Sequence, residues 1–421
     1  RCCNDSKRAI YPNAVEKNFD GVDQDCNGND NVSVEIVVEE NTQAEHEINN
    51  FNVGHKTSFN IFETPESGSV EIKRSNDLFS LSKKDSIPLE KAQHIDVSGE
   101  YLYVTSFDNG FIVFDISDKE NVKIVGSYTF TGYCGGIFVY GNMAYVIGSY
   151  NGQYGLIIVD ISDPTQPVYA GSYASESNVY DVVVEDGFAY LACGYDSPDV
   201  LVLDISKPSN PILVGSYDAE GNVRDIAIQG KYLFLASSIA GLEVVEIINH
   251  SSLVHVGRFD PGFKYDTSDV DVEVSRGIAY SIIGKTLYIV DVSDPVSPSL
   301  IRKIVDNNRS LKLYNDLLLV GGSSYMKIYD ISDPGNAINV FYGDMAYSTG
   351  TYFDVKDDFI FTPNYKSGLE IYKVVVPKSA ISYLPDQNYF GLDNFVVRAV
   401  SGILNDSYLD FFINIKQRMS H

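Results

Sequence analysis

The segment Asp20–Asp30, DGVDQDCNGND, gathers acidic and amide side chains around two glycines. Three of these side chains stand at alternate positions and Gly28 follows them, as in the first half of an EF-hand calcium loop. Alternate side chains of a tight loop converge on one point, and glycine permits the bend past an ion. The segment therefore predicts a site for a hard cation, the alternative being a solvated acidic linker without an ion. The candidate oxygen ligands are Asp20, Asp23, Asp25, Asn27 and Asp30.

A second candidate site comes from aspartates that recur at one position of an internal repeat. The position lies early in the first strand of each copy, facing or rimming a central channel, and could form an acidic mouth for a cation or cationic ligand. The alternative, which the repetition favours, is that each aspartate accepts hydrogen bonds from backbone amides. The equivalent residues along the chain are His94, Gly136, Asp181, Asp225, Asp271, Ser310 and Tyr352.

The side chains that could act as nucleophiles or bases form no recognisable catalytic motif. None of the six histidines stands near a nucleophile motif, and no glycine-rich phosphate loop follows a strand. Cys134 and Cys193 are expected to be buried small hydrophobes rather than a pair. The sequence therefore predicts that the protein is not an enzyme.

The recurring aspartates lie in a sequence repeat of 39 to 45 residues, and this repeat predicts the strands that position them. Three clear copies are FIVFDISDKENVKIVGSY from Phe111, LIIVDISDPTQPVYAGSY from Leu156 and VLVLDISKPSNPILVGSY from Val200. A hairpin of two alternating strands with a glycine-containing turn precedes the repeated segment. Each unit thus predicts four antiparallel strands, which is one blade of a β-propeller.

The number of units predicts how the ring closes. Six complete units run from about His94 to Met345, and a seventh lacks its outer strand. The segment Asn76–Glu90 has the pattern of that missing strand. We therefore expect seven blades, closed by one strand from the N-terminal side, because such a clasp removes exposed sheet edges.

The consensus LxIVDISDPxxPxxVGSY resembles the LVIVD repeat of bacterial and archaeal surface proteins, which form β-propellers. The resemblance covers Leu78 to Val375 and implies a surface setting without a general catalytic role.

The N-terminal stretch CNDSKRAIYPNAVEKNFDGVDQDCNGND resembles the MopE-type metal-binding motif of secreted bacterial proteins. The resemblance implies calcium, and a ligand set of oxygen atoms agrees with it. Bound calcium would stiffen a segment that lacks a hydrophobic core of its own. A disulfide from Cys3 or Cys2 to Cys26 is expected and would indicate an oxidising compartment, with the partner of Cys26 left open.

The ends of the chain resemble two halves of a cadherin-like or bacterial Ig-like domain. KTSFNIFETPESGSVEI precedes the propeller, and AISYLPDQNYFGLDNFVVRAVSGILNDSYLDFFINI follows it. Neither half could bury an adequate core alone, so we expect one β-sandwich interrupted by the propeller, with two independent stubs as the alternative. The expected domains are an acidic calcium-binding motif at 1–31, the first half of the sandwich at 32–75, the propeller at 76–375 and the second half at 376–421.

Charge and hydropathy narrow the function. A net charge of −26 over 421 residues argues against nucleic acid and anionic membranes as partners, and no apolar run is long enough to insert into a bilayer. We expect an extracellular or cell-surface subunit for adhesion or assembly, whose partners are other surface proteins, glycans or copies of itself. One alternative is a repeating subunit of a surface layer or filament. Another is a propeller enzyme or small-ligand receptor that uses the acidic channel mouth.

Overall fold

The structure is a computed structural model, and it divides into two compact units that we describe separately. One unit is Leu81–Tyr314 with Leu318–Val374, and the other is Arg1–Ser80 with Asn315–Leu317 and Val375–His421. Side chains are described within 81–343 and 352–374, apart from the gaps in the ranges that follow. The described residues are 32–39, 44–48, 58–63, 68–73, 80–107, 109–129, 133–194, 198–237, 239–262, 270–322, 325–344, 352–375, 379–385, 391–400 and 407–416.

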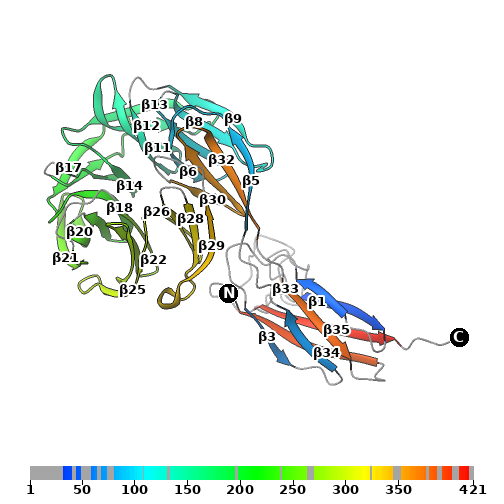
Figure 1. Cartoon of the computed structure of the whole chain (residues 1–421). Helices are drawn as coiled ribbons and strands as arrows, with labels where there is room; N and C mark the ends of the chain where they lie inside the picture. Colours follow the sequence, from blue (N-terminus) through cyan, green and yellow to red (C-terminus); the bar gives the residue numbers. More distant parts are fainter. Residues whose placement is uncertain are drawn as a thin grey trace, which may run out of the picture. The chain divides into compact units, whose positions relative to one another are not determined.

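The larger unit is a propeller of seven four-stranded antiparallel blades (Figure 1). The first, innermost strands of blades 1 to 7 are β6 (Ala92–Ser98), β10 (Cys134–Tyr140), β14 (Asp181–Glu185), β18 (Val223–Gln229), β22 (Val270–Ser275), β26 (Asn308–Tyr314) and β30 (Asp354–Lys356). The second strands are β7 (Tyr101–Ser106), β11 (Met143–Tyr150), β15 (Phe188–Ala192), β19 (Tyr232–Ser237), β23 (Ile278–Ile283), β27 (Leu317–Gly322) and β31 (Phe359–Asn364).

The third and fourth strands complete each blade. The third strands are β8 (Gly110–Asp115), β12 (Gln153–Asp160), β16 (Val200–Asp204), β20 (Gly241–Asn249), β24 (Thr286–Asp291), β28 (Tyr325–Asp330) and β32 (Gly368–Val375). The outer strands are β9 (Lys123–Tyr128), β13 (Val168–Ala174), β17 (Ile212–Tyr217), β21 (Ser252–Phe259), β25 (Ser299–Val305), β29 (Ile338–Asp344) and β5 (Ser80–Ile87). A short 3-10 helix, Pro334–Asn336, precedes β29. Among the described residues, no helix is long and apolar enough to cross a membrane.

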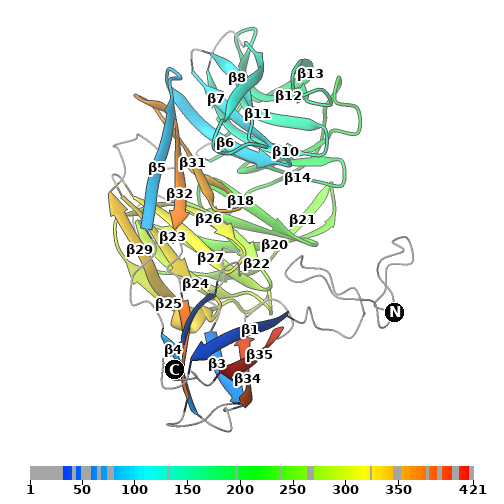
Figure 2. The ribbon, with the colours of Figure 1, turned by 90° about the vertical axis from the view of Figure 1, so that its right-hand side faces the viewer.

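The ring closes by the predicted clasp. Strand β5 is the outer strand of blade 7 and pairs with β32, so the blade combines one strand from the N-terminal side with three from the C-terminal side (Figures 1 and 2). Lys83 Nζ lies 2.9 Å from Glu370 Oε1, and Ser86 donates a hydrogen bond to the carbonyl of Ser367 at 3.4 Å. The pairing confirms both the blade count and the role of the segment Asn76–Glu90.

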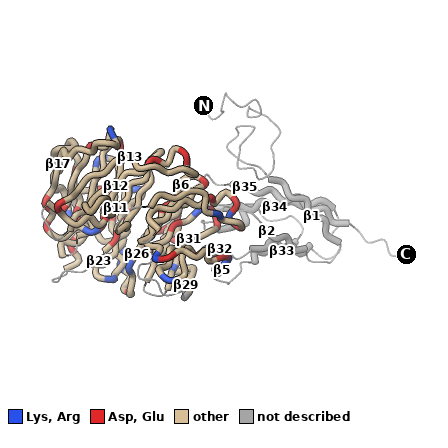
Figure 3. The backbone as a smooth tube through the Cα atoms, turned by 90° about the horizontal axis from the view of Figure 1, so that it is seen from above, with Lys and Arg blue, Asp and Glu red and all other residues tan. Residues whose placement is uncertain are grey.

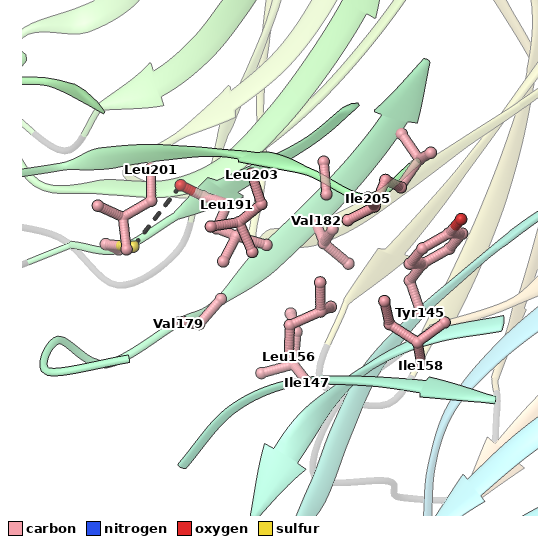
Figure 4. Close-up of a cluster of buried hydrophobic side chains, with 13 residues drawn as sticks. Tyr145, Ile147, Leu156, Ile158, Val179, Val182, Leu191, Leu201, Leu203 and Ile205 are labelled. Carbon is pink, nitrogen blue, oxygen red and sulfur yellow. Dashed lines mark hydrogen bonds between the residues drawn. The ribbon is translucent and has the colours of Figure 1, made fainter. Parts of the chain in front are cut away.

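Hydrophobic clusters between neighbouring blades hold the ring together. The cluster between blades 2 and 3 brings Ile147, Leu156 and Ile158 against Val182 and Leu203, all almost fully buried (Figure 4). Corresponding clusters join blade 1 to blade 2, blade 3 to blade 4, blade 4 to blade 5, blade 5 to blade 6, and blade 7 to blade 1. The runs of β-branched and aromatic residues in the third strands are therefore buried on both faces, as in a packed blade.

The glycine of the repeated VGSY sequence has a packing role. A Cβ atom on Gly171 would lie 2.9 Å from the Cα of Ser209 and still closer to the carbonyl oxygen of Pro208, in the turn of the next blade. Gly126, Gly215 and Gly257 approach the matching turns of their next blades in the same way. The outer strand of one blade thus contacts the turn of the following blade at a distance that only glycine permits.

The aspartate that ends the third strand caps the following turn. Asp160 Oδ1 accepts a hydrogen bond from the backbone N–H of Ser162 at 2.8 Å, and Asp291 Oδ1 accepts one from Ser293 at 2.9 Å. These hydrogen bonds, first from the serine hydroxyl and then from its amide, lower the pKa of both carboxyls. The repeated aspartate is therefore a turn-capping residue, as short acidic side chains commonly are.

In the smaller unit, strands from both ends of the chain pair with each other. One sheet has the order β1 (Val32–Glu39), β35 (Ser407–Lys416), β34 (Gly391–Val400) and β3 (Ser58–Glu63). The other has the order β2 (Ala44–Ile48), β33 (Ser379–Pro385) and β4 (Gly68–Lys73). Strands β1 and β35 are parallel, and the other pairs are antiparallel. This pairing agrees with one interrupted module, while the Ig-like assignment and the domain boundaries stay predictions.

Candidate functional site

The propeller encloses a cavity of about 370 Å³ that the innermost strands line. Residues two apart on a strand share a face, so each blade presents two positions to the channel, which we call the first and second layers. In blades 1 to 7 the first layer is His94, Gly136, Asp181, Asp225, Asp271, Ser310 and Tyr352. The second layer is Asp96, Phe138, Val183, Ala227, Glu273, Lys312 and Asp354.

The three first-layer aspartates form a chain across blades 3, 4 and 5. Their ladder registers are equivalent, each opposite the matching residue of the second strand. Neighbouring carboxyls are hydrogen-bonded to one another, Asp181 to Asp225 and Asp225 to Asp271. Two carboxyl groups can share a hydrogen bond only if one of them carries a proton.

Each of these aspartates also bonds the next blade. The Oδ2 atom accepts a backbone N–H in each case: Asp181 from Ile226 at 3.2 Å, Asp225 from Val272 at 2.6 Å, and Asp271 from Leu311 at 2.8 Å. The donor of each of these bonds belongs to the innermost strand of the following blade, and Asp181 also accepts a backbone hydrogen bond from Val182 of its own blade. These carboxyls therefore link blades as well as line the channel.

Burial sets the protonation of this chain. Removal from bulk water, followed by the charge of the neighbouring carboxyl, raises the pKa of Asp181 and of Asp225 well above the usual range. Burial raises the pKa of Asp271 to about 8. All three residues are half-buried and line the cavity. At neutral pH the row of three aspartate carboxyls therefore retains protons.

An aromatic pair occupies the first layer in blades 7 and 1. The rings of Tyr352 and His94 lie 3.7 Å apart between centroids, at an interplanar angle of 32°. Burial lowers the pKa of His94 to about 4, so the imidazole is neutral at physiological pH. The loss of surrounding water inside the channel, with the aspartates as a smaller cause, raises the pKa of Tyr352, although 42% of the residue is exposed to the cavity.

The second layer contains a charge cluster that sequence reasoning missed. Lys312 Nζ lies 3.3 Å from Asp354 Oδ1, while Asp354 Oδ2 accepts the backbone N–H of Val97 at 2.8 Å. Asp96 Oδ2 accepts the backbone N–H of Val139 at 2.6 Å. Burial and then the charge of Asp354 raise the pKa of Asp96 to about 7. The available signal was a charged residue two positions after the first layer in the innermost strands of blades 1, 5, 6 and 7.

The two layers together connect most neighbouring blades. Carboxylate bonds run from blade 7 to 1, from 1 to 2, from 3 to 4, from 4 to 5 and from 5 to 6. The ion pair of Lys312 joins blade 6 to blade 7, and the Tyr154 hydroxyl donates to the carbonyl of Val179 between blades 2 and 3. The polar groups of the channel thus stabilise a closed ring.

Outside the channel, a buried carboxylate joins blades 3 and 4. Glu243, whose side chain is fully buried, accepts a hydrogen bond from the Tyr217 hydroxyl and lies 3.0 Å from Nδ1 of His255. Glu370 occupies the same position of blade 7 and receives Lys83. A buried carboxylate with several donors is strongly held, so we assign both glutamates a structural role.

The predicted metal ligands Asp20, Asp23, Asp25, Asn27 and Asp30, and the predicted disulfide of Cys26 with Cys3 or Cys2, lie outside the described residues. Within the residues that are described, no group of three His, Cys, Asp or Glu side chains is arranged to hold a metal ion. Cys134 and Cys193 are buried and unpaired by any disulfide, as predicted.

Comparison with known families identifies the repeat and the N-terminal motif. The LVIVD repeat matches residues 90–130, 131–175, 177–219, 220–261 and 268–306, which are blades 1 to 5. A motif described as "Putative metal-binding motif" and named for MopE matches residues 3–31. The fold and the repeats thus define a seven-bladed β-propeller protein built on LVIVD repeats, in which residues 3–31 match the MopE-type motif. No curated protein matches the chain.

Solved structures resemble the propeller in fold alone. The WD40 β-propeller domain of Doa1 matches with 13% identity and a TM-score of 0.53 over 70% of this chain and 97% of that one. The computationally designed Ika8 protein matches with 11% identity and a TM-score of 0.50 over 69% of this chain and 98% of the other.

Proposed function

We propose that this chain is a non-catalytic interaction platform in an extracellular or cell-surface assembly, where it serves in adhesion or in holding other components together. The observation that carries the proposal is the bonding of the channel. Its carboxylates and Lys312 join successive blades, so they stiffen the ring instead of forming a reactive centre. A rigid ring presents loops and blade edges without an ordering cost when a partner binds.

The nucleophiles among the described residues support a non-catalytic role. Burial raises the pKa of Cys134 and raises that of Cys193 to about 12, so neither forms a thiolate readily. The His94 imidazole, neutral and stacked on Tyr352, faces no cysteine in the channel lining. Covalent catalysis needs a nucleophile held beside its base.

The connections of blade 7 support display of the propeller. Strand β5 begins at Ser80 and β32 ends at Val375, and the contacts of Lys83 with Glu370 and of Ser86 with Ser367 show that they run antiparallel. The chain therefore enters and leaves at the end of the ring where the other blades carry their Asp-Ile-Ser-Asp turns. The first layer of the channel lies at the opposite end, away from these connections.

We assign calcium to the N-terminal motif as a structural ion. The candidate ligands are carboxylate and amide oxygens, which suit a hard cation better than zinc or copper. Binding would stabilise a segment too short to bury a core. A disulfide at Cys26 would act in the same direction and fits an oxidising, extracellular setting.

The partners proposed are other surface proteins, glycans or further copies of this chain. A net charge of −26 disfavours nucleic acid and anionic lipid. On the propeller, basic residues are scattered among acidic ones over several blades (Figure 3). Association through short-range contacts at loops and edges is therefore favoured over binding through a broad basic surface.

Location and envelope binding test the proposal together. Intact source cells are labelled with a membrane-impermeant biotin reagent, and the chain is followed by antibody beside a cytoplasmic control protein. Labelling of this chain but not of the control is expected. The purified full chain should also sediment saturably with envelopes isolated from the same cells. A chain protected from the reagent, or one that stays in the supernatant at every envelope concentration, contradicts the proposal.

A further inference from the structure

The first layer of the channel is divided into two walls. Carboxyls occupy blades 3, 4 and 5, and aromatic rings occupy blades 7 and 1. In a ring of seven, blade 4 stands opposite the junction of blades 7 and 1, so the walls face each other. The small residues Gly136 of blade 2 and Ser310 of blade 6 separate them. Bonds between blades do not by themselves require carboxyls on one side of the first layer and rings on the other. Carboxylates of both layers make such bonds, Asp96 to Val139 and Asp181 to Ile226.

The acidic wall has oxygen atoms left to face a ligand. Each aspartate uses Oδ2 for the backbone N–H of the next blade. The remaining oxygens meet one another through shared protons, in a cavity of about 370 Å³. A cationic donor placed there would replace those protons with stronger, charge-assisted hydrogen bonds. The volume lies in the range of small-molecule sites and exceeds what a single ion needs.

The opposite wall suits the same kind of ligand. Tyr352 is 42% exposed although it lines the cavity, so its ring is open to contact. His94 carries no charge at neutral pH and does not repel a cation. Aromatic rings attract cations through their faces and pack well against hydrocarbon.

We propose that this cavity binds a small organic cation whose primary ammonium contacts neighbouring carboxyls of the row Asp181, Asp225 and Asp271 and whose apolar part packs against Tyr352 and His94. The site is separate from the platform role above and does not depend on it. A bare metal ion fits less well, since no three carboxylates among the described residues converge as metal ligands.

Other charged groups lie around this site. Arg224 and Arg309 line the cavity one residue before the first layer, and the Arg224 guanidinium stands 5.1 Å from the ring centroid of Tyr180. Deeper in the channel, Lys312 is held by Asp354. The lining also includes Asp96 and Glu273, so these cations balance only part of its acidic residues.

Three molecules of nearly the same shape test the charge of the ligand. Benzylamine, benzyl alcohol and benzoate are titrated into the full chain and followed by calorimetry and by saturation-transfer NMR. Benzylamine is expected to bind at least about tenfold more tightly than benzyl alcohol, and benzoate is expected not to bind. Benzoate binding better than benzylamine, or all three binding alike, overturns the proposal. Calcium that binds here and displaces benzylamine also overturns it in favour of a metal site.

Matched variants locate the site. Asp225→Asn keeps an oxygen for the Val272 amide but cannot ionise to pair with the ammonium, and it should weaken benzylamine binding at least about tenfold. Asp294→Asn is the same substitution in an exposed turn at the other end of the ring and should leave binding unchanged. Tyr352→Ala should weaken it as well. If Asp225→Asn unfolds, Asp181→Asn replaces it; wild-type affinity in a folded first-layer variant refutes the assignment.

Discussion

Substituting Gly171 by alanine tests how the repeat holds neighbouring blades at a fixed distance. The added Cβ would stand 2.9 Å from both the Ser209 Cα and the Pro208 carbonyl carbon, and closer still to its oxygen. All three are backbone atoms, so no side chain can rotate away, and blade 3 would have to shift relative to blade 2. Overpacking of this kind costs about 1–3 kcal/mol, and we expect the upper end because the obstacle is backbone.

The assay is calorimetric unfolding of the full chain, since the protein contains no tryptophan for fluorescence. A cost of about 3 kcal/mol should lower the melting temperature of the propeller transition by several degrees. Gly335→Ala is the control, because its Cβ would meet nothing nearer than Asp333 Oδ1 at 3.4 Å. Equal melting temperatures for Gly171→Ala and the control would refute the packing role of the repeated glycine.

Three further predictions concern titration, metal binding and thiol reactivity. Burial raises the pKa of Asp271 to about 8, against about 4 in an unfolded chain. Its contribution to the free energy of unfolding is therefore complete below pH 4 and is lost as the pH rises through 8. Asp271→Asn should therefore show less loss of stability than wild type between pH 4 and 8 in urea unfolding, and parallel curves would contradict this. Calcium should raise the melting temperature of the wild type, and chelator should lower it, while an Asp23→Ala/Asp25→Ala variant should not respond; a full response in the variant would move the ion elsewhere. Cys134 and Cys193 should resist a thiol reagent in the folded state and react on unfolding, because both are buried; rapid labelling in native buffer would count against the structure.

The outline of the propeller could be predicted because residues that mark strand ends and turns recur in the repeat. The position that ends the third strand, an aspartate in five of the seven copies, recurs at a spacing of 39 to 45 residues, together with the hairpin turns and, in the first four copies, the glycine of the outer strand. The missing outer strand of blade 7 could be found because its partner segment precedes blade 1. In a closed ring the incomplete seventh blade and the strand before blade 1 can pair only with each other. The local strand pattern and the closure of the ring therefore agree.

The candidate site was predicted only in part. The first layer was identified by aligning the repeats, including Asp181, Asp225 and Asp271. The second layer was missed because Lys312 and Asp354 are 42 residues apart and become partners only when blades 6 and 7 meet. The hydrogen bond from each carboxylate to the next blade could not be predicted either. A sequence shows which residue type recurs, but not which neighbouring residue that side chain contacts.

The sequence by itself determined the strand order, the number of blades, the closing strand and the oxygen-rich motif at the N-terminus. These features are local or periodic: each strand, turn and motif is encoded within a segment shorter than one repeat, and the blade count and closing strand follow from counting the repeats. The tertiary structure decided which blade each carboxylate bonds, where protons are retained, and why a glycine is required beside the turns of blades 2 to 5. Those properties depend on distances between blades and on the removal of water, and neither is a property of any single segment.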